Sequence, residues 1–233
     1  MISHHYKCVF IHIPKSAGTS IGTKLGIYAS EGKNVQDHRT LKQVMPLGPG
    51  ALAIYRKEIA RDHYIRFRAK LEGRPFLTRE QYQNYFKFTF VRNPWARVHS
   101  WYRNVLNDAN HLRDYQVPAD ASLDWFIKNR LYTVQPQLEF IRDWDGTIPL
   151  DFIGRFENLH EDFSYVCQKL GISDYTLPER VRIGTPLYVP EYTEENIDIV
   201  AKAFREEIEH FDFKFGESLK AKLENQTAEL SQS

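Results

Sequence analysis

A lysine and several tiny or hydroxyl-bearing residues stand between an apolar run and an expected helix, in the stretch FIHIPKSAGTSIG at residues 10–22. The apolar run, residues 8–13, is β-prone and has His12 as its one polar member, which predicts a buried strand. Pro14 ends this strand. A lysine-bearing loop after a strand suits the binding of a small anion, because it places a mobile positive charge close to main-chain N–H groups.

The residues after this loop predict a helix that begins near Gly18 or Thr19, since apolar residues recur from Ile21 at the spacing of one helix face. The first N–H groups of a helix lack partners and carry the positive end of its dipole, and Gly18 would let a bound group come close. Thr19 and Ser20 add hydroxyl donors, and Lys15 adds a full charge. The alternative is an ordinary strand-to-helix turn with a solvated lysine.

A second stretch, FKFTFVRNPWARVHSWY at residues 86–102, also places a cationic side chain between an apolar run and an expected helix. Its first, phenylalanine-rich part predicts another buried strand, and Asn93 with the proline after it predicts the cap and first turn of a helix. Arg92 therefore stands at the carboxyl end of a strand, where open α/β sheets bind ligands, and its planar guanidinium suits a phosphate. Ser100 falls on a polar face of that helix. An arginine on the surface without a ligand is the alternative.

The composition fits a globular protein of 233 residues that buries a sizeable core, with 42% hydrophobic residues. No stretch approaches the roughly 18 consecutive apolar residues of a membrane span, and the first strand leaves no room for a signal peptide, so a cytoplasmic location is expected. Cys8 and Cys167 are expected to be buried thiols. The 9 histidines have no ligand spacing, so no metal site is expected.

Charge is divided unevenly along the chain, because residues 1–115 hold 19 Lys and Arg against 8 Asp and Glu, whereas residues 116–233 hold 12 against 22. The basic half is expected to bind anions or to pair with the acidic half. We expect one domain over residues 1–223, with an inserted basic helical segment at about 50–80. This segment either lines a groove that binds an acidic molecule or covers the acidic half. Residues 224–233 are expected to be a disordered tail.

The two anion-binding stretches resemble, in type and order, the 5′-phosphosulfate loop and the 3′-phosphate motif of the sulfotransferases that use 3′-phosphoadenosine-5′-phosphosulfate (PAPS). The similarity is closest to the carbohydrate branch of that family, with the heparan, chondroitin and uronosyl 2-O-sulfotransferases and small bacterial members. It extends to residues 152–172 and 189–216, but not to the basic segment. The resemblance implies an α/β fold: a single P-loop-like three-layer domain with a parallel sheet flanked by helices, related in plan to nucleotide kinases.

The resemblance also implies roles for individual residues. Lys15 would contact the bridging and sulfuryl oxygens of the donor and stabilise the leaving phosphate, while Arg92 and Ser100 would hold the 3′-phosphate. Two further candidates near the nucleotide, Arg182 and Gly184, lie in VRIGTP at residues 181–186, which reads equally well as a surface loop. The 5′-phosphate would be held by the main chain and hydroxyls of Ser16, Ala17, Gly18, Thr19 and Ser20.

Transfer of a sulfuryl group to an alcohol also needs a base for the proton of the hydroxyl, and it needs no metal. His38, in VQDHRTLKQV at residues 35–44, is the candidate base, because imidazole accepts a proton near pH 7. The uronosyl 2-O-sulfotransferases are similar in having a catalytic histidine between the two donor motifs. A polar loop histidine is the alternative, His63 and Glu31 are reserve candidates for the base, and His99 is expected to be structural.

These observations predict an enzyme that moves a sulfuryl group from PAPS to a hydroxyl of a saccharide or glycan, without nucleic acid as a partner; the oligomeric state stays open. A P-loop-like nucleotide or small-molecule kinase is one alternative, although the pattern G-x-x-x-x-G-K-[ST] is absent and Lys15 precedes its glycine. A non-catalytic binder of acidic glycans is another, and its affinity would fall steeply with salt.

Overall fold

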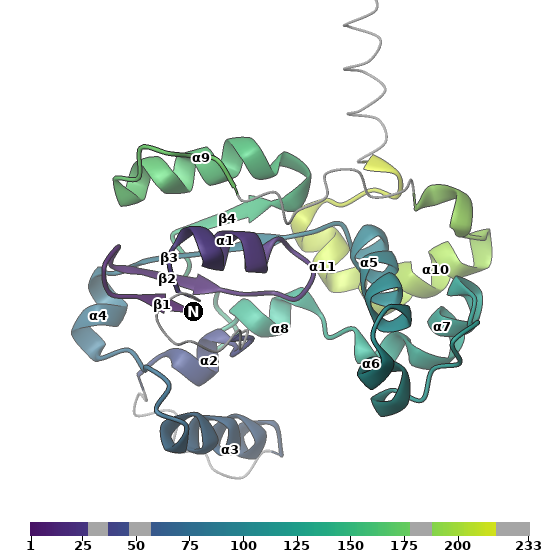
Figure 1. The fold of residues 1–233 in the computed structure, drawn as a ribbon, viewed down its shortest axis with the longest axis horizontal. Helices are drawn as coiled ribbons and strands as arrows, with labels where there is room; N and C mark the ends of the chain where they lie inside the picture. Colours follow the sequence, from purple (N-terminus) through teal and green to yellow (C-terminus); the bar gives the residue numbers. More distant parts are fainter. Residues whose placement is uncertain (28–36, 47–56, 178–187, 218–233) are drawn as a thin grey trace, which may run out of the picture. The chain divides into compact units, whose positions relative to one another are not determined.

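The structure is a computed structural model that describes residues 1–27, 37–46, 57–177 and 188–217 (Figure 1). Contacts divide the chain into two compact units. Unit 1 comprises Met1–Val91 and Gln137–Val181, and unit 2 comprises Arg92–Pro136 and Arg182–Ser233. The first part of unit 2 is therefore inserted between two segments of unit 1. The expectation of one domain over residues 1–223 stays a prediction.

Unit 1 is built on a four-stranded sheet in the order β1-β2-β3-β4. The strands are β1 (Ile2–Ser3), β2 (Cys8–Ile11), β3 (Phe86–Val91) and β4 (Phe152–Arg155). β2, β3 and β4 run parallel, whereas β1 pairs antiparallel with β2. Parallel neighbours end at the same edge of a sheet, so the chain leaves β2, β3 and β4 at one edge, the usual place for a ligand site in such folds.

Helices cover both faces of this sheet, with α1 and α9 over one face and α2 and α8 over the other (Figure 1). The helices of unit 1 are α1 (Gly18–Lys24), α2 (Leu41–Val44), α3 (Lys57–Leu71), α4 (Arg79–Asn84), α8 (Gln137–Ile141), the 3-10 turn η3 (Phe156–Asn158) and α9 (Leu159–Leu170). The expected α/β class, with a sheet flanked by helices, is confirmed. β1 is an antiparallel addition to the predicted parallel sheet.

A phenylalanine-rich core lies under α1 and α9, because alternate side chains of the parallel strands point to that face. The rings of Phe10 and Phe88 stack with centroids 5.0 Å apart, and Phe90 and Phe163 are fully buried in the same cluster. Both faces of the strands are buried, as their apolar runs predict. The core holds the carboxyl ends of β2 and β3 in register.

The two cysteines are free and buried, as expected. Burial raises the pKa of the Cys8 thiol to about 12 and that of Cys167 to about 11. Among the described residues, no helix combines the length and the apolar character that crossing a membrane requires.

The described part of unit 2 is helical. Its elements are α5 (Pro94–Leu106), α6 (Ala109–Asp114), α7 (Leu123–Arg130), η2 (Leu131–Thr133), η4 (Val189–Glu191), α10 (Glu194–Ala203) and α11 (Arg205–Phe211). α5 packs against α6, α7 and α10, and α10 packs against α7 and α11. The amphipathic helix expected after the second apolar strand is therefore present as α5.

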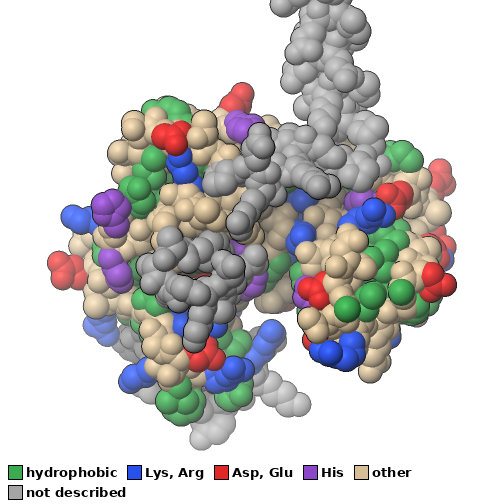
Figure 2. Space-filling view, viewed as in Figure 1, with side chains coloured by type: hydrophobic (Ala, Val, Ile, Leu, Met, Phe, Trp, Pro, Cys, Tyr) green, Lys and Arg blue, Asp and Glu red, His purple; other side chains and the backbone are tan. Residues whose placement is uncertain are grey.

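α3 occupies the basic segment and leaves one side open to solvent. Tyr64, Phe67 and Leu71 are between 60% and 72% exposed, at the spacing of one helix face. The neighbouring Arg68 and Lys70 are also exposed. Figure 2 shows blue Lys and Arg side chains next to green hydrophobic ones at the lower left, where Figure 1 places α3.

The close contact of β3 and β4 yields a test of the core. An added Cβ at Gly154 would lie 2.5 Å from Cε1 of the fully buried Phe90 ring. We expect Gly154→Ala to lower the free energy of unfolding by about 1–3 kcal/mol, because a closely packed core gives little room. Denaturant unfolding measures this, and the double variant with Phe90→Leu should recover part of the loss. Equal stability of Gly154→Ala and the parent protein would contradict the contact.

Candidate active site

The loop between β2 and α1 has an unusual backbone. Lys15 and Ala17 have φ angles of 69° and 64°, in the left-handed region that residues with side chains seldom adopt. The N–H of Ser16, between them, donates to the carbonyl of Ile13 at 3.3 Å. α1 then begins at Gly18, as predicted. Strained backbone of this kind concentrates at ligand sites, and alternation of handedness can turn successive N–H groups toward one anion.

Two buried side chains beside this loop carry polar atoms without hydrogen-bond partners. Ser16 is 1% exposed and its Oγ has no partner, and His12 is 2% exposed with an unpartnered Nδ1. An unpaired buried polar atom costs about 1–3 kcal/mol, so such atoms need an explanation such as a ligand or a bound water. A hydroxyl next to Lys15 that lacks a partner is what a site for an oxyanion provides.

His12 packs directly against Gly18. A Cβ on Gly18 would lie 1.7 Å from Cδ2 and 1.8 Å from Nε2 of the His12 imidazole. Gly18 is expected to let a bound group come close, but in the structure the His12 ring occupies the space of the missing side chain. His12 is thus a member of the site that sequence reasoning missed, although its position as the polar residue of an apolar run was a signal.

His38 lies against the other side of the same ring. The centroids of the two imidazoles are 4.2 Å apart, and Nδ1 of His38 is 3.3 Å from the main-chain oxygen of His12. A carbonyl oxygen only accepts, so Nδ1 carries the proton in this hydrogen bond. In the neutral ring, Nε2 then has a free lone pair. This tautomer, with the proton on Nδ1, is the one that a base acting through Nε2 needs.

Both imidazoles are held in the neutral form. Burial lowers the pKa of His38, and the bond to His12 and the charge of Asp37 offset only part of this shift. Burial lowers the pKa of His12 well below its usual value, and the charges of the Met1 α-amino group and of Lys15 lower it further. A neutral His38 at pH 7 is able to accept a proton.

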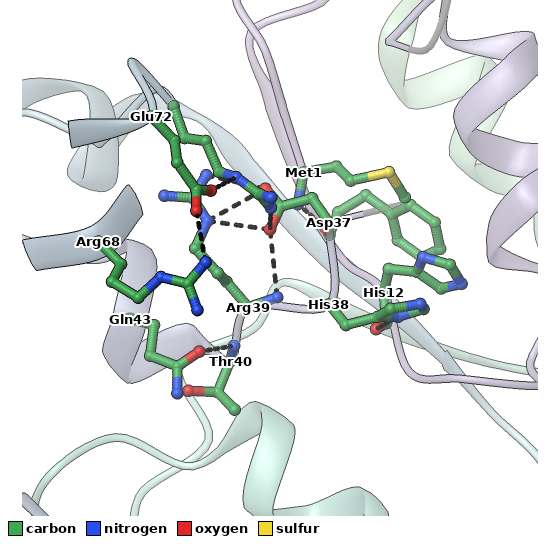
Figure 3. A network of polar contacts seen from close by, with 11 residues as sticks. Met1, His12, Asp37, His38, Arg39, Thr40, Gln43, Arg68 and Glu72 are labelled. Atoms are coloured by element: carbon green, nitrogen blue, oxygen red, sulfur yellow. Dashed lines mark hydrogen bonds and ion pairs between the residues drawn. The ribbon is translucent and has the colours of Figure 1, made fainter. Parts of the chain in front are cut away.

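The segment that carries His38 is anchored by an ion pair (Figure 3). Asp37 accepts from Nε of Arg39 at 2.9 Å and from Nη2 of Arg39 at 2.8 Å, and the Arg39 guanidinium lies 5.1 Å from the ring centroid of Phe76. Arg39 is 4% exposed. Both oxygens of the Asp37 carboxylate accept from the Arg39 guanidinium, so this acid acts as an anchor of the segment.

The anchor continues into α3 through further charged groups (Figure 3). Arg74 lies 3.8 Å from Asp37 and also pairs with Glu72, which pairs with Arg68. Arg66 donates to the carbonyls of Lys42 and Met45 at 2.9 and 2.7 Å. Arg66 therefore holds α2 and α3 together. Among the side chains of α3 that the structure describes, the exposed cations are Arg61, Arg68 and Lys70.

Arg92 and Ser100 belong to unit 2. Arg92 follows the last residue of β3 and is 5% exposed, while Ser100 is half-buried on α5. The helical spacing predicts that Arg97 shares the polar face of Ser100. This is wrong for Arg97, which is 2% exposed and donates to the carbonyl of Gln135 at 2.6 Å. A buried main-chain acceptor has drawn this arginine inward.

Two other residues of the second motif are structural. Nδ2 of Asn93 donates to the carbonyl of Lys214 at 2.8 Å, so its side chain does not form the expected helix cap. The His99 ring is 1% exposed and its Nε2 is 3.0 Å from Oε1 of Glu191. The structural role expected for His99 agrees with this burial.

The structure describes one of the remaining candidates, His63. His63 lies on α3 with its ring 5.9 Å from that of Trp144. Arg182, Gly184 and Glu31 lie outside the described residues. Within the described ranges, no group of three or more His, Cys, Asp or Glu side chains is arranged to hold a metal ion.

The fold and the loop define an α/β protein whose first parallel strand leads into a lysine-bearing loop with left-handed backbone. The sequence model of the Sulfotransferase family matches residues 1–230, and the chain belongs to this family. Carbohydrate sulfotransferase 14 of Danio rerio is 29% identical over 164 residues, which cover 60% of this chain and 45% of the relative. The chain thus spans less than half of that relative's length.

A protein of Archaeoglobus fulgidus described as uncharacterized is 34% identical over 110 residues, which cover 45% of this chain and 80% of the relative. No solved structure gave a significant match. Membership in the sulfotransferase family supports transfer of a sulfuryl group as the general reaction.

The Asp37–Arg39 pair yields a prediction on stability. Burial alone would raise the Asp37 pKa, but the α-amino group of Met1 and the Arg39 guanidinium lower it well below its usual range. We expect Asp37→Asn to lower the free energy of unfolding by roughly 3 kcal/mol near pH 7, because it leaves Arg39 buried without its partner.

The sign of the pH dependence follows from the lowered pKa of Asp37. The stabilisation is fully present above the unfolded-state pKa of about 3.9 and is lost as the pH falls below it. Denaturant unfolding between pH 7 and pH 3 should therefore show the difference shrinking in acid. The exposed Asp120→Asn is the matched control, and a loss of equal size at every pH would contradict the ion pair as its cause.

Proposed function

We propose that the protein transfers a sulfuryl group from PAPS to a hydroxyl group of a saccharide. The observation that carries the proposal is the buried Ser16 hydroxyl without a partner, beside Lys15 in a strained loop, in a chain of the sulfotransferase family. The relative named carbohydrate sulfotransferase 14 supports a saccharide as the acceptor. The residues present fit an anionic donor, since the loop offers a cation, a hydroxyl and main-chain N–H groups.

Each part of the donor site has a role in this proposal. PAPS supplies a sulfuryl group on a phosphate leaving group. Ser16, Ala17, Gly18, Thr19 and Ser20 hold the 5′-phosphate, and Lys15 stabilises the negative charge that develops on the phosphate oxygen as the sulfuryl group departs. Arg92 and Ser100 hold the 3′-phosphate, an assignment supported by the order of the two motifs. Arg182 and Gly184 are further candidates near the nucleotide.

His38 is the proposed base. Its Nε2 takes the proton from the acceptor hydroxyl while the acceptor oxygen bonds to sulfur and the bond from sulfur to the phosphate oxygen breaks. The hydrogen bond from Nδ1 to His12 fixes the required tautomer. The exposed cations of α3 are a candidate acceptor surface for an acidic saccharide.

Binding of adenosine 3′,5′-bisphosphate, the product left by PAPS, distinguishes the residues that hold PAPS from the base. We expect Lys15→Ala and Arg92→Ala to weaken binding of adenosine 3′,5′-bisphosphate by about tenfold or more, since each removes a charge-assisted contact. His38→Ala should bind it like the parent protein yet lower transfer to chondroitin or desulfated heparan oligosaccharides by about a hundredfold or more. Calorimetry without magnesium and a sulfate-transfer assay measure the two quantities.

Lys202→Ala and His160→Ala, at exposed positions, serve as matched controls. Equal loss of binding in the His38 variant would contradict its role as base. A preference of the parent protein for ATP with magnesium would favour the kinase instead. Salt-sensitive binding of acidic glycans without transfer would favour the non-catalytic binder.

The lowered pKa of His38 predicts the acid side of the pH–rate profile. A base must be unprotonated, so kcat/KM should stay high below pH 6.5 and fall about tenfold per pH unit only below the lowered pKa. A profile of kcat/KM between pH 5 and pH 8 measures the midpoint. A midpoint above about 6.5, the ordinary value, would contradict a buried histidine as the base.

A further inference from the structure

The His12 ring stands between the two functional parts of unit 1. One edge of the ring fills the space above Gly18, at the end of the Lys15 loop, and one face lies 4.2 Å from the His38 ring. The main-chain oxygen of the same residue accepts from His38. The separation between the anion loop and His38 therefore depends on one side chain.

The imidazole holds this position at an energetic cost. The ring is 2% exposed and its Nδ1 has no hydrogen-bond partner, which costs about 1–3 kcal/mol. A phenylalanine of similar volume would avoid that cost, and Phe10 already stacks on the ring from behind, with centroids 5.9 Å apart. The chain holds a rigid, neutral ring in contact with both the loop and the imidazole of His38.

The charged groups that surround this ring come from several elements. The ammonium of Lys15 faces it from the loop, Asp37 and His38 face it from the segment before α2, and the α-amino group of Met1 faces it from the start of the chain. Asp37 and the same α-amino group also act on His38. A neutral ring at this place adds no charge that would compete with Lys15 for an anion.

We propose that His12 is a positioning residue that spaces the anion loop from the base: its ring sets the place of Gly18 on one side and of His38 on the other. The part that concerns the base rests on the proposed function. The spacing itself is a property of the folded chain and can be measured without an acceptor.

A double-mutant cycle tests the contact with the loop. In the parent protein, Gly18→Ala should weaken binding of adenosine 3′,5′-bisphosphate by about tenfold or more, because the new methyl displaces the ring and the loop. In the His12→Ala background the same methyl has room, so its further effect should be below about threefold. Equal effects in both backgrounds would overturn the coupling. Failure of the parent protein to bind the nucleotide would instead count against the proposed function.

The pKa of His38, measured by NMR on protein with labelled histidine rings, tests the contact with the base and needs no ligand. His12→Ala opens His38 to water, so its pKa should rise toward about 6.5, whereas His12→Phe keeps the ring volume and should leave the pKa low. The acid midpoint of kcat/KM should shift in the same direction. An unchanged pKa in His12→Ala, or an equal rise in both variants, would overturn spacing by the ring.

Discussion

The contact between the His12 imidazole and the α-carbon of Gly18 is the constraint on which the arrangement of the candidate site depends. It requires a glycine at the first residue of α1, and it places the ring where the tilted ring of His38 packs against it. Burial keeps both rings neutral, because a charged imidazole would lose its hydration there. One close contact therefore links the loop before α1 to the surroundings of His38.

The position of His38 depends equally on groups that are distant in sequence. Arg39 is held by Asp37 and by the ring of Phe76, and Arg66 joins α3 to the end of α2. The segment before α2 is short, so its conformation comes from these partners and not from its own helix or strand propensity. α3 and the segment that carries His38 thus form one supported part of unit 1.

The order of loop residues separates this site from that of a P-loop kinase. Lys15 lies before the glycine and has a left-handed backbone, whereas in the kinase pattern the lysine follows the glycine inside the helix start. Family membership supports a sulfuryl group as the group that is transferred. In the proposed reaction, negative charge develops on the leaving phosphate, and Lys15 would neutralise it.

The sequence by itself determined the strands β2 and β3, the start of α1 and the lysine-bearing loop between strand and helix, because these follow from the periodicity and types of neighbouring residues. Only the tertiary structure decided that His12 separates Gly18 from His38, that Asp37 binds Arg39, and that Arg97 turns inward to Gln135. Side-chain partners of this kind depend on rotamers, burial and the available volume once the elements have packed, and residue spacing along the chain does not encode them.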